Sequence, residues 1–160
     1  MGAAMGQYSI CSAFENDKTI YYMGYVYAKG TTITYKINAS KAVENVTLKV
    51  NLATVYKTNV TFGPTGEYAW KVTVNGTVLD YTPFTYDGKI NSDLTGEFKT
   101  YTLSTTVSLK EGENVIEFIT DNENEVYGTM NGFAPVIDYI QLFAEEKVEF
   151  SYEPIYKNLQ

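Results

Sequence analysis

Hydrophobic and polar residues alternate along most of this chain, and this period of two limits the fold more than any other feature. Successive side chains of a β-strand point to opposite faces, so alternation predicts strands with one apolar and one polar face. No segment has a helical period, and Thr, Val, Ile and Tyr suit a pleated sheet. We therefore predict an all-β fold, an antiparallel β-sandwich. The alternating segments are 31–37, 46–55, 68–74, 101–109, 114–120 and 134–143.

Turn residues separate these segments. Asn75-Gly76 is a strong signal for a tight hairpin, and Gly112 marks a second turn. Residues 7–145 contain no linker or repeat and are interpreted as one domain. Residues 1–6 are interpreted as a cloning remnant or trimmed boundary, and residues 146–160 as an edge strand or the exit to another module.

Composition excludes several kinds of function. The 160 residues carry a net charge of −7 and include neither His nor Arg, which rules out His-based triads and His-ligated zinc. An acidic surface repels nucleic acid, and no apolar run approaches the length of a membrane span. Cys11 is the only cysteine, so no internal disulfide forms. Basic positions filled only by Lys, with plentiful Asn, Ile and Tyr, suggest a low-GC bacterial source.

Two long connections, 81–98 and 121–135, carry aromatic residues among Asn, Asp and Gly. Long connections in compact domains are usually functional or disordered. Sugar recognition needs a flat apolar ring surface with amide, carboxylate or hydroxyl groups around it. We expect a carbohydrate site here, or alternatively rings that merely cover the end of the sandwich. The candidate residues are Tyr127, Asn131 and Phe133 in one connection, and Tyr86 and Asn91 in the other.

Trp70 alternates in phase with Val72 and Val74, so we expect it in the core rather than at a binding site. Glu111, Glu113 and Glu117 are the most plausible pair-forming carboxylates for a glycosidase. A catalytic acid needs a cleft and a raised pKa, and Glu111 and Glu113 lie in a polar turn. We expect them to be solvated and the domain to have no catalytic function.

Asp138 interrupts the apolar segment 134–143. Strict alternation puts it on the more apolar face with Val136, Ile140 and Leu142, where an unpaired charge is costly. Two explanations remain open. In the first, the carboxylate accepts hydrogen bonds from backbone N–H groups. In the second, it is one ligand of a structural Ca²⁺ ion, and backbone carbonyls complete the coordination shell.

The chain resembles carbohydrate-binding modules of families six, thirty-five and thirty-six over about half of its length. Those modules share a Val-Asn-Gly hairpin, a turn followed by a strand, and a closing strand containing Ile-Asp. The hairpin corresponds here to residues 74–76. The matching residues of the other two elements are Val107, Leu109, Gly112, Asn114 and Ile116, and then Ile137, Asp138, Ile140 and Leu142.

The resemblance implies a jelly-roll sandwich that binds carbohydrate without catalysis and directs an appended enzyme to polysaccharide. It implies a ligand site in the loops at one end of the sandwich or on the concave sheet face, and Asp138 as a calcium ligand. Near the N-terminal position of the family's usual glutamate pair, this chain has Glu15 and Asp17. Val136 stands where the family often has a sugar-contacting Asn.

We therefore expect a secreted bacterial protein, extracellular or at the cell surface, in which this domain is a monomeric module of a larger multidomain chain. Its expected partner is a polysaccharide or glycan, with no nucleic acid and no membrane. The alternative is a structural or adhesive sandwich that packs beside a catalytic domain or binds a protein.

Overall fold

The computed structural model describes most of the chain. No helix, and thus none long and apolar enough to cross a membrane, occurs in the part it describes. The described ranges are 7–15, 18–26, 32–54, 58–66, 69–90, 96–121 and 135–152.

These residues form fourteen strands and confirm the all-β prediction. Most pairs are antiparallel, as the alternation requires. The strands are β1 (Gln7–Glu15), β2 (Lys18–Val26), β3 (Thr32–Ala39), β4 (Val43–Thr54), β5 (Val60–Phe62), β6 (Trp70–Val74), β7 (Thr77–Val78), β8 (Phe84–Tyr86), β9 (Gly96–Glu97), β10 (Lys99–Thr102), β11 (Val107–Leu109), β12 (Gly112–Thr120), β13 (Pro135–Phe143) and β14 (Phe150–Ser151).

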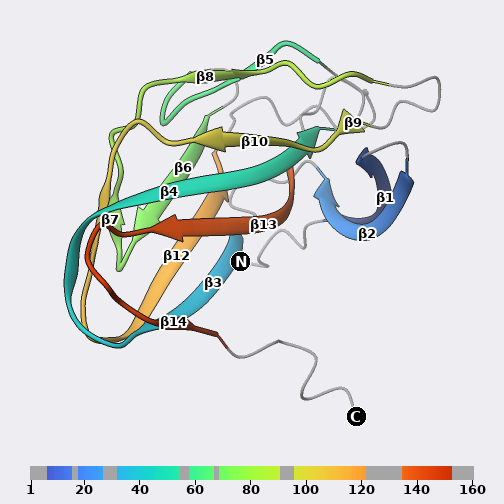
Figure 1. Ribbon diagram of the computed structural model, residues 1–160. Coiled ribbons are helices and arrows are strands. Elements are labelled where there is room, and N and C mark those ends of the chain that lie inside the picture. The colour runs from blue at the N-terminus through green and yellow to red at the C-terminus, as the bar shows by residue number, and fades with distance from the viewer. Residues whose placement is uncertain are drawn as a thin grey trace, which may run out of the picture.

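Two sheets form the sandwich (Figure 1). In the front sheet, β4 is central: β10 and β11 pair with one of its edges and β13 with the other. The back sheet has the order β14-β3-β12-β6-β7. A short ribbon of β5 and β8 lies beyond the front sheet at the top of the view.

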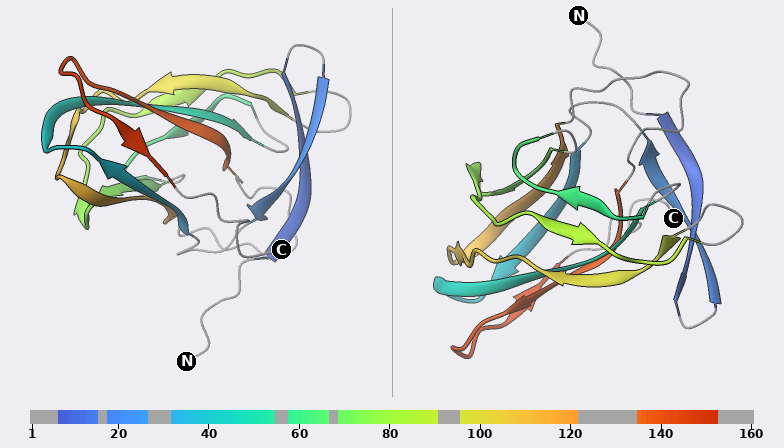
Figure 2. Two further views of the ribbon diagram at one scale, coloured as in Figure 1. Left: turned by 60° about the horizontal axis from the view of Figure 1, so that its bottom comes forward. Right: turned by 90° about the horizontal axis from the view of Figure 1, so that it is seen from above.

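The hairpin of β1 and β2 was not predicted from the sequence. It lies across one end of the sandwich, as both views of Figure 2 show. Its nine paired positions run from Gln7 opposite Val26 to Glu15 opposite Lys18. A short parallel pairing of β1 with β9 joins the hairpin to the rest of the fold.

The core fills the space between the two sheets. Its largest side chain is Trp70, which is fully buried, as predicted. The Trp70 ring packs on Phe62 and Phe118, with centroids 5.2 and 4.9 Å apart. Burying each such side chain stabilises the fold by about 1.5–3 kcal/mol. From β4, alternate residues enter this core without exposure: Val46, Leu48, Val50 and Leu52.

Asn75 and Gly76 form the predicted tight turn between β6 and β7. Both have positive φ angles, 50° and 83°, as a type I′ turn requires. Asn114 joins this turn to the one before β12. Its fully buried side chain accepts from Asn75 Nδ2 and Lys110 N, and donates to the carbonyls of Lys110 and Gly112. One side chain therefore holds two turns in register.

Two segments differ from the expectation, and a third takes one of two expected forms. The predicted strand 101–109 is divided into β10 and β11, because Ser104 and Thr105 hydrogen-bond to the segment 80–82 instead of continuing the ladder. The connection 81–98 is not an irregular loop, since it contains β8 and β9. The tail supplies β14 at the edge of the back sheet, one of the two alternatives left open by the sequence.

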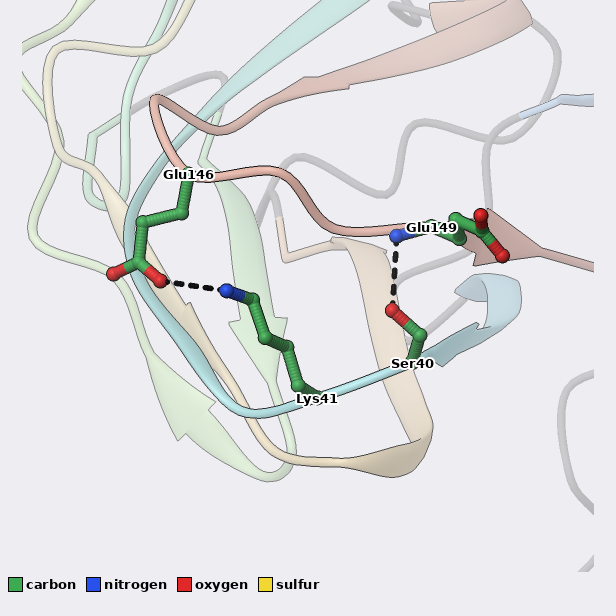
Figure 3. A network of polar contacts seen from close by, with 4 residues as sticks. All are labelled: Ser40, Lys41, Glu146 and Glu149. Atoms are coloured by element: carbon green, nitrogen blue, oxygen red, sulfur yellow. Dashed lines mark hydrogen bonds and ion pairs between the residues drawn. The ribbon is translucent and has the colours of Figure 1, made fainter.

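A small polar network attaches this tail to the turn between β3 and β4 (Figure 3). Ser40 and Glu149 exchange two hydrogen bonds of 3.0 Å, from Ser40 N to the Glu149 carbonyl and from Glu149 N to Ser40 Oγ. Lys41 Nζ lies 2.9 Å from Glu146 Oε2. Exposed ion pairs contribute about 0–1 kcal/mol, so the backbone bonds contribute most of the attachment.

Replacing Asn114 with Ala should lower the free energy of unfolding by about 1–3 kcal/mol, because its buried partners would lose their hydrogen bonds. Urea denaturation measures this change. Glu113→Ala is the matched control, because the Glu113 side chain is next to Asn114 in the sequence and is exposed. Its free energy of unfolding should stay within about 0.5 kcal/mol of the parent value. Equal stability of the two variants would show that Asn114 does not fix these turns.

Candidate functional site

A β-bulge in β13 decides which side chains reach the surface of the front sheet. Ile137 pairs with Leu52 and Tyr139 with Asn51, so Asp138 is an extra residue that has no partner in the register. An extra residue shifts the alternation by one position. After the bulge, Ile140 and Leu142 pair with core residues of β4, as Ile137 does before it. All three side chains therefore point to the same face, toward the core.

The bulge removes Asp138 from the strict alternation on which its expected place rested. The sequence put its carboxylate on the apolar face with Ile140 and Leu142, but the bulge leaves Asp138 exposed. Its charge still acts at β3: burial, followed by the nearby Asp138 carboxylate, raises the pKa of Tyr35 to about 12. The Asp138 carboxylate, in the front sheet, therefore lies near Tyr35 in the back sheet.

The outward side of the front sheet combines aromatic rings with polar groups. We define it as the outer face, made of alternate residues of three neighbouring strands. Tyr139 and Phe143 are 37% and 50% exposed, whereas most large apolar side chains in the described sequence are buried. Cross-strand pairing aligns the face in rows: Tyr139, Asn51 and Thr100; Gln141, Lys49 and Thr102; and Phe143 with Thr47.

Two contacts order the side chains of the outer face. Asn51 Nδ2 donates to Thr100 Oγ1 at 3.0 Å, and Lys49 Nζ lies 5.0 Å from the centroid of the Phe143 ring. A cation over an aromatic face stabilises the pair by about 0.5–1 kcal/mol at exposed sites. Asn51 is 3% exposed, and its Oδ1 has no hydrogen-bond partner in the structure as described. The contact from Lys49, which is in β4, restrains the Phe143 ring.

Most of the residues predicted for a carbohydrate site in the loops lie outside the described ranges. These residues are Tyr127, Asn131 and Phe133 in the connection 121–135, and Asn91 in the connection 81–98. Their role in binding stays a prediction.

Tyr86 is described, and its predicted role is wrong. It is fully buried, and its hydroxyl donates to the Glu97 carbonyl at 2.6 Å. A Cβ at Gly88 or Gly96 would collide with the Tyr86 side chain, so these glycines allow the chain to close around the ring. A sugar has no access to the ring face of Tyr86, which serves as a core residue.

Next to Tyr86, the exposed Asp87 forms a reciprocal pair with Tyr101. The Tyr101 hydroxyl donates to Asp87 Oδ1 at 2.6 Å and accepts from Asp87 N at 2.9 Å. This hydrogen bond lowers the pKa of Asp87. The ring of Phe84 stacks between Phe62 and Tyr101, so neither of its faces is available to a ligand.

The predicted calcium site at Asp138, with backbone carbonyls completing its shell, stays a prediction. The described part of the chain contains no group of three or more His, Cys, Asp or Glu side chains that could hold an ion. Glu15, which the resemblance brought into consideration, pairs with Lys18 at the tip of the β1–β2 hairpin. The exposed Asp138 carboxylate is one oxygen donor group, and six to eight oxygens surround Ca²⁺.

The carboxylates considered for catalysis are solvated or structural. Glu111 and Glu113 are exposed, as expected for a turn. Glu117 accepts a hydrogen bond from Thr73 Oγ1 at 3.1 Å across the ladder of β12 and β6. These three side chains therefore form no acid–base pair.

The fold itself has a counterpart. No protein-family model and no curated protein matches the chain. A solved structure of a family 35 carbohydrate-binding module from an environmental isolate is similar over 94% of this chain and 96% of its own, with a TM-score of 0.52. The chain has the fold of a carbohydrate-binding module. Sequence identity is 17%, so the likeness concerns the fold and confirms the predicted sandwich.

Sequence reasoning did not single out the outer face as a candidate site. Alternation did place Tyr139, Gln141 and Phe143 on one face, which was the available signal. It also put Ile137 with them, and that obscured the difference between a buried and an exposed side of β13. Only the bulge separates Ile137 from the two rings.

The buried Tyr86 predicts a specific loss of stability in alkali. Burial is the main cause that raises its pKa from 10.0 to about 12, so the folded state holds the phenol proton more tightly than the unfolded state. The resulting contribution of Tyr86 to the free energy of unfolding is fully present below pH 10 and is lost as the pH rises to 12. Tyr86→Phe should therefore lose less stability than the parent between pH 9 and 12 in urea titrations. The same pH dependence in both proteins would contradict the assignment.

Proposed function

We propose that this domain binds carbohydrate without cleaving it, and that the outer face of the front sheet is its binding site. One observation supports the site above the others. Two exposed aromatic rings, Tyr139 and Phe143, stand on the same side of β13 with Gln141 between them. The fold shared with a carbohydrate-binding module supports the class of ligand.

The chemistry of the face suits a sugar. A pyranose presents C–H groups on its faces and hydroxyls around its edge, and aromatic rings bordered by polar groups complement both. Hydroxyl groups of Thr100 and Thr102 and the amide of Gln141 supply donors and acceptors across the strands. Each hydrogen bond contributes about 1 kcal/mol net, because it replaces one to water. An open face with few such bonds should bind with a Kd between about 1 μM and 1 mM.

In this proposal the domain is a secreted bacterial module that holds an appended enzyme on its polysaccharide. Weak binding suits that role, since tethering raises the effective concentration of the enzyme at the substrate. The exposed Glu111 and Glu113 support a domain that contributes binding and no hydrolysis. Incubation with the bound glycan should accordingly release no reducing sugar, and turnover that disappears in Glu113→Gln would contradict this.

A glycan array followed by titration calorimetry tests the site. Tyr139→Ala and Phe143→Ala should each weaken binding of the best array ligand at least tenfold, because each removes one stacking surface. Tyr152→Ala is the matched control: it removes an aromatic ring that is 71% exposed and follows β14 at the edge of the back sheet, and binding should not change.

Tyr127→Ala and Phe133→Ala test the alternative site in the loops. If these two variants lose binding while Tyr139→Ala and Phe143→Ala retain it, the site is in the loops and the outer face is not used. If no glycan binds the folded parent, the function itself is refuted, and an adhesive or structural role becomes the better explanation.

Calcium binding is a separate proposal, supported by the resemblance of the closing strand rather than by a set of ligands in the structure. An ion that binds only the folded state raises the melting temperature by mass action. With Asp138 among its ligands, the parent should melt at a higher temperature in millimolar Ca²⁺ than in EDTA, and Asp138→Asn should lose this difference. An unchanged melting temperature in the parent would exclude a structural calcium ion.

A further inference from the structure

The two aromatic residues of the outer face are too far apart to contact one sugar. No register shift occurs between Tyr139 and Phe143, and the rise per residue of a strand places them about 13 Å apart along β13. A single pyranose ring is much smaller than this separation. It can stack on either aromatic ring but not on both.

Between the two rings the face offers exposed or partly exposed hydrogen-bonding side chains. Gln141 lies midway along the strand and is exposed, and its cross-strand neighbour is Lys49. The sequence of groups along β13 is thus aromatic, amide, aromatic. This order matches a linear chain whose successive sugars present alternately a ring face and hydroxyl groups.

The charges around Tyr139, Gln141 and Phe143 argue against an acidic polysaccharide as the ligand. Asp138 is exposed directly before Tyr139, and residues 145–149, which follow Phe143, contain three glutamates and one lysine. Lys49 is the only cation among the residues that define the outer face, and its ammonium is engaged with the Phe143 ring. The net charge of −7 adds a long-range repulsion of anions.

We infer that the outer face binds an extended, uncharged polysaccharide chain that lies along β13 and contacts Tyr139 and Phe143 with different sugars. This inference rests on the proposed function and specifies its ligand. The site takes an internal stretch of the sugar chain, because Tyr139, Gln141 and Phe143 are all exposed and contact successive parts of it along the strand. Lys49 is a positioning residue that holds the Phe143 ring for its sugar.

Chain length tests the inference directly. The probes are unbranched β-1,4-linked glucan, xylan and mannan oligosaccharides of two and six sugars, with the corresponding oligogalacturonates as acidic probes. Calorimetry should show that at least one neutral hexasaccharide binds ten times more tightly than its disaccharide. Tyr139→Ala and Phe143→Ala should each reduce the affinity of the hexasaccharide about tenfold, with unchanged melting temperatures.

Lys49→Met keeps the aliphatic stem and removes the ammonium. It should weaken binding of the neutral hexasaccharide less than Phe143→Ala does, and Lys49→Arg should restore it.

Three results would overturn the inference while leaving carbohydrate binding intact. They are equal affinity for the disaccharide and the hexasaccharide, tighter binding of the oligogalacturonates, and array ligands that belong to none of the neutral linear classes. The proposed function fails on different evidence, namely the absence of any array ligand.

Discussion

The bulge at Asp138 is the local constraint on which the candidate site depends. Because β13 gains one residue there, Ile137, Ile140 and Leu142 all pack toward the core, while Tyr139, Gln141 and Phe143 point outward. Without the extra residue, one side of the strand would have to mix core and surface positions. The partner strand β4 reinforces the arrangement, since its apolar core residues Leu48, Val50 and Leu52 lie opposite the inward set and its polar residues Thr47, Lys49 and Asn51 lie opposite the outward set.

Aromatic residue type does not by itself identify a binding surface in this protein, which has fifteen tyrosines. Tyr81 and Tyr86 are buried, and their hydroxyls donate to the backbone carbonyls of Trp70 and Glu97. Those hydroxyls satisfy the hydrogen-bonding need of a buried phenol, so both residues strengthen the core. Tyr139 differs because its strand position points outward, and that difference makes it a candidate ligand contact.

Much of the sandwich follows from the sequence, because alternation and turn chemistry are local properties. The strands β3, β4, β6, β12 and β13, the turn at Asn75 and Gly76, and the core place of Trp70 were all predictable. The bulge was not, because one inserted residue leaves the apolar pattern of 134–143 looking regular. Nor was the burial of Tyr86, which depends on close approach at Gly88 and Gly96, contacts set by tertiary structure. The β1–β2 hairpin lacks clean alternation, so its strands gave no comparable signal.

The central claim is that the exposed side of the β10-β4-β13 sheet receives the glycan. Nuclear magnetic resonance tests it most directly, by following backbone amide shifts of the labelled domain during titration with its best glycan. The largest shifts are expected at 47–51, 100–102 and 139–143. Shifts confined to 81–98 and 121–135, with the sheet unaffected, would contradict the claim and place recognition in the loops.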